Sequence, residues 1–538
     1  MGCTLHASSL LQQHQQQEAG VATNTIHGKC RILAMDILPK RESTEETVTS
    51  RDANRLREEG AELKHVDKCN AMDRLEFEAR RRSFQGGSSG LDVYRTHVNL
   101  TDSCEGFWSM FPRKMWTSEG SPLLLALVAL LAITTPAFSA PAEVTQDEEP
   151  EECKQDENCF LPDCLCGSVH HPGDIPLEQV PQFVVLSFDD AITKDNYDFY
   201  LRFKNIKNPN KCRITMTFFV SHLYTNYSMV NELHRLGHEI ALHSVTHKSD
   251  VQNYWRPANE SVWQREMDDV RDIIVENAKI PRNDLKGWRA PFLEVGGNEM
   301  FTALSEAGLT YDSSWPTLEY TNWHGANPKG ALWPYTLDYP SIQDCQLGRC
   351  PSKKFKGQWV MPMVDLNDNT GEACAMLDTC RSLDDELLTN PDAVFYFLKR
   401  NFNINYLNNK APYGLYVHHS WFYEGTLNNS DARMEGYTRF LEWLSVMDDV
   451  YVVSLDRVLE WVRNPVPLSE INTIDAFRCQ VFDPETTCPD VDENTFTQTN
   501  NLPYGLREVI MATCTRPKPE FYPWLYNPYG TEDIVPDS

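Results

Sequence analysis

The stretch VVLSFDDAI, residues 184–192, runs an apolar segment directly into two adjacent aspartates, Asp189 and Asp190. A short continuous apolar run of this kind is typical of a buried strand. Two carboxylates so close together disfavour joint ionisation unless solvent or a cation compensates for their charge. The stretch therefore predicts a buried strand that ends in a charged site, with either water or a metal ion as the compensating group.

Eight β-type runs, beginning with this one, alternate with segments that repeat apolar residues at helical spacing. The candidate strands are 183–188, 213–220, 238–244, 287–292, 309–314, 359–366, 414–421 and 450–455. The candidate helices are 228–237, 261–279, 298–309, 392–407 and 433–447. Strand–helix alternation implies right-handed crossovers and a parallel sheet. Eight strands favour a (β/α) barrel over an open sheet, so we predict an α/β fold of this type.

The unusual polar residues of the chain follow the ends of these candidate strands. In (β/α) barrels the chemistry collects at the C-terminal ends of the strands. The segments concerned are DD (189–190), HSVTH (243–247), RAPF (289–292), DSSW (312–315) and HHSW (418–421). They belong to the first, third, fourth, fifth and seventh strands, and the barrel would bring all of them to one face. Scattered structural residues are not expected to do this.

Asp190, His243 and His247 are candidate metal ligands. The two histidines lie four residues apart, so both imidazoles can point toward one ion. The chain has 15 histidines, and such a spacing also arises by chance, so an ordinary histidine pair is the plain alternative. A carboxylate from a neighbouring strand end favours a zinc site, because two imidazoles and one carboxylate are a ligand set of catalytic zinc. Asp190 would then be held ionised, which leaves Asp189 to act on an attacking water.

Three further side chains are candidates for the same site. Arg289 would pair with Asp189 and keep it ionised, with an ordinary barrel salt bridge as the alternative. His418 is a candidate general acid, because its ordinary pKa suits proton donation near neutrality. His419 is its rival, but neighbours on a strand face opposite sides, so only one of the two can face the site. Trp315 is either an aromatic wall for a sugar ring or a core tryptophan.

Cysteine content and charge bound the class of protein. Twelve of the 16 cysteines follow residue 150, several of them closely spaced: 345/350, 374/380 and 479/488. No C-x2-C pair of the kind found in zinc clusters is present, so we expect disulfides and leave their connectivity open. Residues 1–115 hold 16 basic and 16 acidic residues, so the net charge of −28 belongs to the rest of the chain. An acidic surface argues against binding to nucleic acid.

Residues 113–142 have the layout of a secretory signal peptide, with a basic start, an apolar run and small residues. The apolar run is shorter than the roughly 20 residues that span a bilayer, so a signal-anchor is the less favoured alternative. We expect translation to begin at Met110 or Met115, and residues 1–114 to be a disordered leader or an artefact of the reading frame. Sequons at Asn226, Asn259 and Asn428 would permit N-glycosylation.

SFDDA, HSVTH, RAPF, DSSWP and GLYVHHSWF, in this order and spacing, resemble the five motifs of the polysaccharide deacetylase family, also called carbohydrate esterase family 4 or the NodB-homology family. CFLPDCLCG and APYGLYVHHSWF are similar to segments of insect chitin deacetylases, and the resemblance covers about residues 159–463. The family's fold implies a distorted (β/α) barrel of seven to eight parallel strands, with disulfide-stabilised loops and a C-terminal extension. We find no chitin-binding module, which implies the gut-type subgroup.

The resemblance implies a role for each matching residue. The implied roles are general base for Asp189, metal ligands for Asp190, His243 and His247, orientation of the base for Arg289, general acid for His418, an oxyanion contact from the backbone N–H of Phe292, and tuning of His418 by Asp312. The expected domains are a signal peptide (115–140), an acidic linker with a cysteine-rich entry (141–180), a polysaccharide deacetylase catalytic domain (181–463), which the resemblance implies, and a C-terminal extension packed on it (464–538).

These implications define an expected protein. It is a secreted, metal-dependent chitin deacetylase that uses Zn²⁺ or another divalent metal such as Co²⁺ and releases acetate from N-acetylglucosamine units. We expect an extracellular monomer, in the gut lumen or peritrophic matrix, without nucleic acid or stable membrane insertion. The alternatives are a non-catalytic chitin-binding or matrix-organising protein and a deacetylase of another N-acetylated glycan.

Overall fold

The computed structural model describes residues 152–317, 330–380, 389–423, 431–479, 488, 492–497 and 502–533. All of them lie in one compact unit, 136–538. The predicted leader and signal peptide, and the sequon at Asn428, lie outside the described residues. None of the described helices combines the length and the apolar character needed to cross a membrane.

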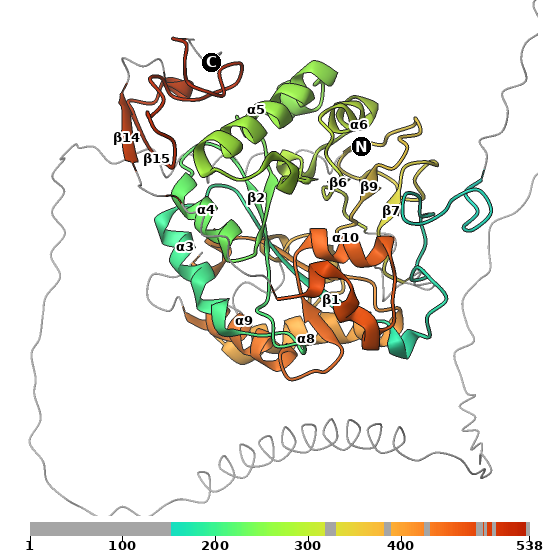
Figure 1. Cartoon of the computed structure of the whole chain (residues 1–538). Coiled ribbons are helices and arrows are strands. Elements are labelled where there is room, and N and C mark those ends of the chain that lie inside the picture. Colours follow the sequence, from blue (N-terminus) through green and yellow to red (C-terminus); the bar gives the residue numbers. More distant parts are fainter. Residues whose placement is uncertain are drawn as a thin grey trace, which may run out of the picture. The chain divides into compact units, whose positions relative to one another are not determined.

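A nine-stranded sheet forms the centre of the structure, with the helices arranged around its outside (Figure 1). Its strand order is β12-β1-β2-β3-β4-β6-β9-β7, and β13 also pairs with β1. The strands are β1 (Gln182–Asp189), β2 (Thr217–Val220), β3 (Glu239–Leu242), β4 (Gly287–Trp288), β6 (Tyr311–Asp312), β7 (Tyr335–Thr336), β9 (Trp359–Val360), β12 (Tyr413–His418) and β13 (Val450–Val452). All pair in parallel except β7, which is antiparallel to β9. The eight candidate strands and the predicted α/β class are confirmed.

The distorted barrel is confirmed as well, and it is open where a regular eight-stranded barrel would close. β12, the seventh expected strand, pairs with Val184–Asp189, and β13, the eighth, pairs only with Gln182–Val184. The reason is that β1 has only two edges. β12 pairs along one of them and β2 pairs with the end of the other, so only the beginning of that second edge is left for β13. Within the described ranges no ladder joins β9 to β12, so the curled sheet stays open there.

The strands are also shorter than expected. The fourth covers two residues of the expected 287–292, and a 3-10 turn, η5 (Pro291–Leu293), follows it. Proline has no N–H to donate to a ladder, so the strand ends before Pro291. The seventh strand stops at His418, where another 3-10 turn, η9 (His419–Phe422), begins.

The five expected helices are confirmed, and the described residues form two more α-helices. The expected ones are α4 (Tyr227–Arg235), α5 (Glu260–Ala278), α6 (Gly297–Glu306), α8 (Pro391–Asn408) and α9 (Asp431–Leu444). The short helices α3 (Lys194–Tyr200) and α10 (Leu455–Arg463) were not anticipated. Asn226 caps α4, because its side-chain oxygen accepts hydrogen bonds from the free N–H groups of Ser228 and Met229.

The two faces of β1 pack into different apolar clusters. Val184, Leu186 and Phe188 belong to the cluster between sheet and helices, and Phe183 and Val185 belong to the second, inside the curl. This is the period of two that a strand imposes. Asp189 therefore continues the inner face, at the carboxyl end of the strand.

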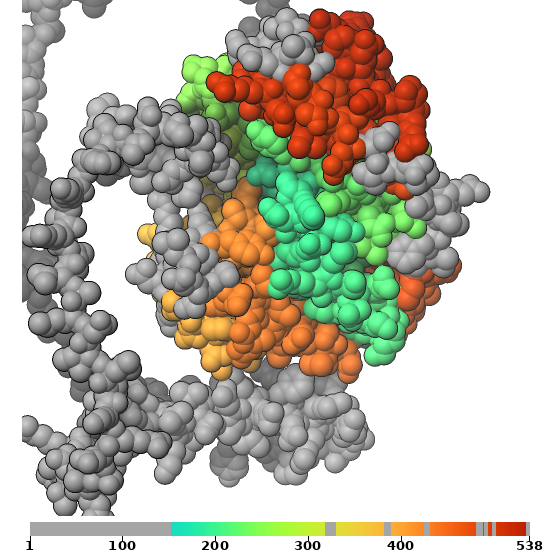
Figure 2. Space-filling model, turned by 90° about the vertical axis from the view of Figure 1, so that its left-hand side faces the viewer, coloured from blue at the N-terminus to red at the C-terminus, as the bar shows by residue number. Residues whose placement is uncertain are grey.

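Short two-stranded sheets and 3-10 turns complete the fold. The pairs are β5 (Val295–Gly296) with β8 (Gly348–Arg349), β10 (Leu366–Asn367) with β11 (Ala373–Cys374), and β14 (Asp492–Thr497) with β15 (Glu508–Thr513). The red C-terminal segment lies against the green segments of the sheet domain in Figure 2. Cys514 N donates to Asn277 O of α5, and the ring Nε2 of His222 pairs with Pro523 O.

The prediction of disulfides is confirmed, and the structure supplies their connectivity. The six disulfides are Cys153–Cys166, Cys159–Cys164, Cys212–Cys479, Cys345–Cys350, Cys374–Cys380 and Cys488–Cys514. In two of the three closely spaced pairs, 345/350 and 374/380, the two cysteines are bonded to each other. The third is not, because Cys479 is paired across 267 residues and Cys488 across 26 residues.

Removal of the long-range disulfide, in the double variant C212S/C479S, should destabilise the protein by roughly 2–5 kcal/mol. The bond closes a loop of 267 residues, so it restricts the unfolded chain more than the five-residue Cys159–Cys164 bond does. Urea unfolding of the two double variants measures the difference. Equal losses of stability in C212S/C479S and C159S/C164S would contradict this account.

Candidate active site

The two adjacent aspartates at the end of β1 point to different surroundings. Asp189 pairs in register with His418 of β12, and its side chain is 2% exposed. Asp190 leaves the strand with a φ of 81° while its N–H donates to Phe219 O, and its side chain is 46% exposed. A positive φ is unusual for a residue with a Cβ, and here it turns the second carboxylate away from the first.

Asp190, His243 and His247 form a cluster suited to a metal ion. Their candidate ligand atoms all lie within 4.8 Å of one another. The Nε2 atoms of the two histidines are 3.2 Å apart, and Asp190 Oδ1 lies 3.5 Å from His247 Nε2 and 3.9 Å from His243 Nε2. Four ligands at zinc distances stand about 3.4 Å from each other in a tetrahedron, so the three atoms fit one ion with little movement.

The protonation states favour ligation. Burial lowers the pKa of His243 to about 4, so the imidazole is neutral at pH 7 and offers a lone pair. Its Nδ1 donates to Arg289 O at 2.9 Å, which leaves Nε2 to face the cluster. Desolvation acts to raise the pKa of Asp190, but the charges of His247, His418 and His243 outweigh it and lower that pKa.

The loop that carries the two histidines is anchored by a buried acid that the sequence analysis missed. Glu266 of α5 accepts hydrogen bonds from Val245 N at 2.9 Å and Thr246 N at 3.0 Å. Tyr254 Oη donates to the same carboxylate at 2.6 Å, and Tyr504 Oη donates to Thr246 O at 2.9 Å. The signal available in the sequence was an acid on the apolar face of the α5 segment. In the structure Glu266 is fully buried, on a helix whose exposed face is charged.

Arg289 is wholly buried and makes every contact of its guanidinium inside the site. Its Nη1 donates to Asp189 Oδ1 and to Ser187 Oγ, both at 2.6 Å. Its Nε and Nη2 donate to Ser313 O and Ser313 Oγ, and the group stacks over the ring of Phe219 at 3.9 Å. A charge-assisted bond to a rigid guanidinium fixes both the ionisation and the orientation of Asp189.

Of the two adjacent histidines, the structure brings His418 to the cluster. Its Nε2 lies 3.9 Å from Asp190 Oδ2, and its Nδ1 is hydrogen-bonded to Asp378 Oδ2. Burial acts against the charged imidazolium, but the carboxylates of Asp378 and Asp190 outweigh it and raise the pKa of His418 to about 10. A bound cation would act in the opposite direction. His419 points to the other face, where it packs against Phe199.

The remaining candidates lie around this centre. Asp312 is fully buried, and its carboxylate accepts from Ser314 N at 3.1 Å and Ser314 Oγ at 2.6 Å rather than from His418. Desolvation raises the pKa of Asp312 to about 6, although the Ser314 hydrogen bonds and Arg289 lower it. Phe292 stacks beside His247, with 4.9 Å between the ring centroids. Trp315 is 1% exposed and donates from Nε1 to Asp344 O, so its contact with substrate stays a prediction.

The Glu266 anchor predicts a variant with weakened metal binding. Glu266→Ala removes the acceptor of two backbone N–H groups in the histidine loop, so we expect zinc affinity to fall by about 10–100-fold, as for other residues that orient ligands. Competition with a coloured chelator measures the affinity, and a circular dichroism melt checks that the variant is folded. Glu276→Gln, a half-exposed acid of the same helix paired with Lys279, is the control. Unchanged zinc affinity in folded Glu266→Ala would contradict the anchoring role.

Comparisons with known proteins identify relatives of this chain. Residues 178–311 match the family model described as polysaccharide deacetylase. The chain is 38% identical over 381 residues to chitin deacetylase 8 of Bombyx mori, covering 70% of this chain and 92% of that protein. It is 37% identical over 390 residues to chitin deacetylase 1 of Bombyx mori, covering 69% of this chain and 67% of that protein.

A solved structure is similar at a greater distance. It is a putative polysaccharide deacetylase from Mycobacterium smegmatis, with 17% identity and a TM-score of 0.34 over 56% of this chain and 95% of that one. The identity to the Bombyx mori proteins over most of their length decides the assignment. On this evidence the chain belongs to the polysaccharide deacetylase family.

Proposed function

We propose that this protein is a secreted, metal-dependent chitin deacetylase. It hydrolyses the N-acetyl groups of N-acetylglucosamine residues, so that acetate is released and chitosan remains. The two Bombyx mori relatives, both chitin deacetylases, support the substrate. The observation that carries the proposal is the juxtaposition of the Asp190–His243–His247 cluster with Asp189 and His418.

Asp190, His243 and His247 would hold the divalent metal, Zn²⁺ or a similar ion such as Co²⁺. When bound, the metal supplies Lewis-acid polarisation of the acetamide carbonyl and of the attacking water. The neutral state of His243 and the ionised state of Asp190 match what ligation requires. Phe292, beside His247, is proposed to offer its backbone N–H to the oxyanion that develops on the carbonyl oxygen.

Asp189 acts as the general base. Its bond to Arg289 supports this role, because the guanidinium keeps the carboxylate ionised and leaves only one oxygen committed. The base takes one proton from the attacking water, and the oxygen forms a bond to the acetyl carbon.

His418 completes the reaction as the general acid. Its Nε2 faces the Asp190–His243–His247 cluster, and His418 is paired in register with Asp189 of the neighbouring strand β1. It donates its proton to the sugar nitrogen while the carbon–nitrogen bond breaks. The products are acetate and an ammonium group on the sugar, and the proton taken up by Asp189 replaces the proton that His418 donated, so atoms and charge balance over the water that was consumed.

Asp189→Asn should lower acetate release from chitin oligomers by about 10²–10⁴-fold, the usual contribution of a general base. The bound metal should remain, because Asp189 is not one of the three proposed ligands. Acetate release and metal content are measured on the same preparation. The change also leaves Arg289 buried without its partner, which costs roughly 3–5 kcal/mol, so a thermal melt must show a folded variant. Wild-type turnover in the variant would refute the assignment of the base.

Chelation should abolish acetate release, and added Zn²⁺ or Co²⁺ should restore it. Asp190→Ala should lose both the metal and the activity, because it removes one of the three ligands. Metal content after dialysis and acetate release from oligomers measure the two properties. Full activity after complete removal of metal would overturn the metal-dependent mechanism. A metal-replete protein that binds chitin oligomers without releasing acetate would point to the non-catalytic alternative.

A further inference from the structure

The contact between His418 and Asp378 comes from a part of the chain that none of the five motifs includes. Asp378 lies in a 3-10 turn, η7 (Leu377–Thr379), and its Oδ2 is hydrogen-bonded to His418 Nδ1. The acid that the resemblance implies for this role, Asp312, is bonded to Ser314 instead. The partner of His418 is therefore supplied by a separate loop.

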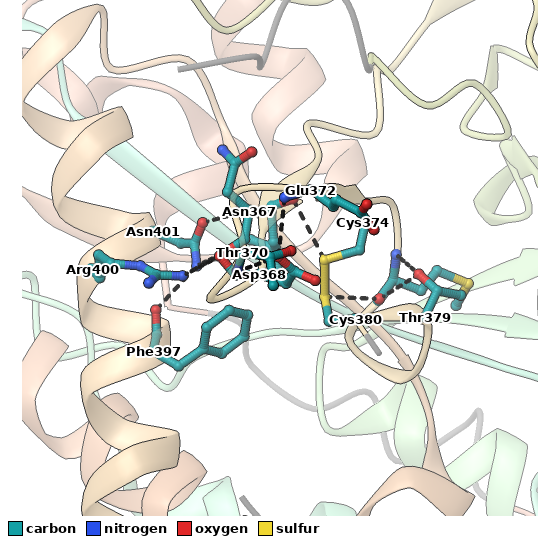
Figure 3. Close-up of a disulfide and its surroundings, with 12 residues drawn as sticks. Asn367, Asp368, Thr370, Glu372, Cys374, Thr379, Cys380, Phe397, Arg400 and Asn401 are labelled. Atoms are coloured by element: carbon teal, nitrogen blue, oxygen red, sulfur yellow. Dashed lines mark hydrogen bonds between the residues drawn. A yellow bond between two sulfur atoms is a disulfide. The ribbon is translucent and has the colours of Figure 1, made fainter. Parts of the chain in front are cut away.

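A disulfide closes that loop (Figure 3). Cys374 ends the hairpin strand β11, and Cys380 directly follows η7. The disulfide joins these two cysteines, which are six positions apart in the sequence, and Asp378 lies between them in the chain. Inside the closed loop, Thr379 Oγ1 accepts from Met376 N at 3.2 Å and donates to Met376 O at 2.8 Å. The hydrogen-bond geometry of a 3-10 turn is poor, so the disulfide and these bonds add constraints on the place of Asp378.

The loop is also fastened to helix α8. Asp368 Oδ1 accepts from Thr370 N at 2.8 Å and Glu372 N at 3.0 Å, which shapes the hairpin turn. Arg400 Nη2 donates to Asn367 O at 2.7 Å and to Asp368 O at 2.9 Å, as Figure 3 shows. The base of the loop is therefore fixed to a helix of 18 residues.

The two carboxylate oxygens of Asp378 have different surroundings. Asp378 Oδ1 is buried and has no hydrogen-bond partner among the described residues. Leaving a buried acceptor unpaired costs free energy, so a carboxylate in this place needs another constraint, and the closed loop supplies one. The other oxygen is committed to His418 Nδ1.

We propose that Asp378 is a positioning residue for His418, and that the Cys374–Cys380 disulfide holds Asp378 in that position. Asp378 accepts a hydrogen bond from the Nδ1–H of His418 and so orients the imidazole ring. In this orientation Nε2, which lies 3.9 Å from Asp190 Oδ2, is the atom that exchanges a proton with the substrate. The role rests on the proposed function, because it concerns the proton that the leaving amine receives.

The test compares two substrates that differ in their leaving group. A chitin oligomer needs a proton on its departing amine, whereas an aryl acetate releases a phenolate without one. We expect Asp378→Ala to lower kcat on the oligomer by about 10–100-fold with little change in KM, and to change aryl acetate turnover by less than about threefold, since general acids contribute about 10²–10⁴-fold. Asp378→Asn, which keeps an acceptor oxygen, should recover part of the loss. Asp392→Ala, at an exposed acid of α8, is the control.

A double variant shows whether Asp378 acts through His418. In the His418→Gln background, Asp378→Ala should cause no further loss on the oligomer, because the two changes remove the same contribution. Additive losses, or equal losses on both substrates, would overturn the positioning role. Ring ¹⁵N spectra of His418 test the contact without catalysis: the proton should reside on Nδ1 in the wild type and not in Asp378→Ala. If the wild-type protein releases no acetate, the proposed function fails while these spectra still decide the contact.

A second pair of variants tests the disulfide. C374S/C380S should reproduce the pattern of Asp378→Ala, with loss on the oligomer and retention on the aryl acetate. C159S/C164S, which removes a bond spanning five residues in the entry segment, should leave both activities near wild type. Wild-type oligomer turnover in C374S/C380S would overturn the role of the disulfide. The role of Asp378 itself would then be decided by the Asp378 variants alone.

Discussion

Arg289 is the side chain on which the arrangement of the site depends. Its guanidinium fixes Asp189 at the end of β1, its carbonyl oxygen orients His243 from the loop after β3, and its Nε and Nη2 reach Ser313 after β6. A buried guanidinium must satisfy all its donors, because an unpaired charge in the interior is costly. Since the donors form a rigid planar fork, satisfying them also sets the spacing of three strand ends. One residue thus couples the orientation of the base to the orientation of a metal ligand.

The same region departs from ordinary backbone geometry. Asp190, Ser244, His247 and Phe292 have φ values of 81°, 77°, 44° and 59°. Such conformations persist in residues with a Cβ only where the surroundings enforce them, and they gather at functional sites. Glu266 supplies part of that enforcement by accepting two N–H groups of the histidine loop. The acid removes the loop's unpaired donors and holds its imidazoles toward Asp190.

Periodicity in the sequence predicted much of this. The alternation of strands and helices indicated the parallel sheet, and parallel strands end at a common edge, which is why five separated motifs were expected together. The period of two along β12 indicated that only one of His418 and His419 faces the site, and the structure turns His418 inward. Closure was not predictable in this way. β12 takes one edge of β1, and β13 pairs with the part of the other edge that β2 leaves free, but the apolar pattern of these strands does not record which edge each one takes.

The sequence by itself determined the class of fold, the residues at the strand ends and the use of cysteine for disulfides, because these follow from local pattern and composition. Only the tertiary structure decided that Cys479 pairs with Cys212, that Glu266 holds the histidine loop and that Asp378 contacts His418. The physical reason is common to all three. Each joins segments far apart in the chain through a single side chain in a loop or a helix face, and no repeat or spacing records such a contact. Their partners are set by where packing of the whole sheet brings the loops.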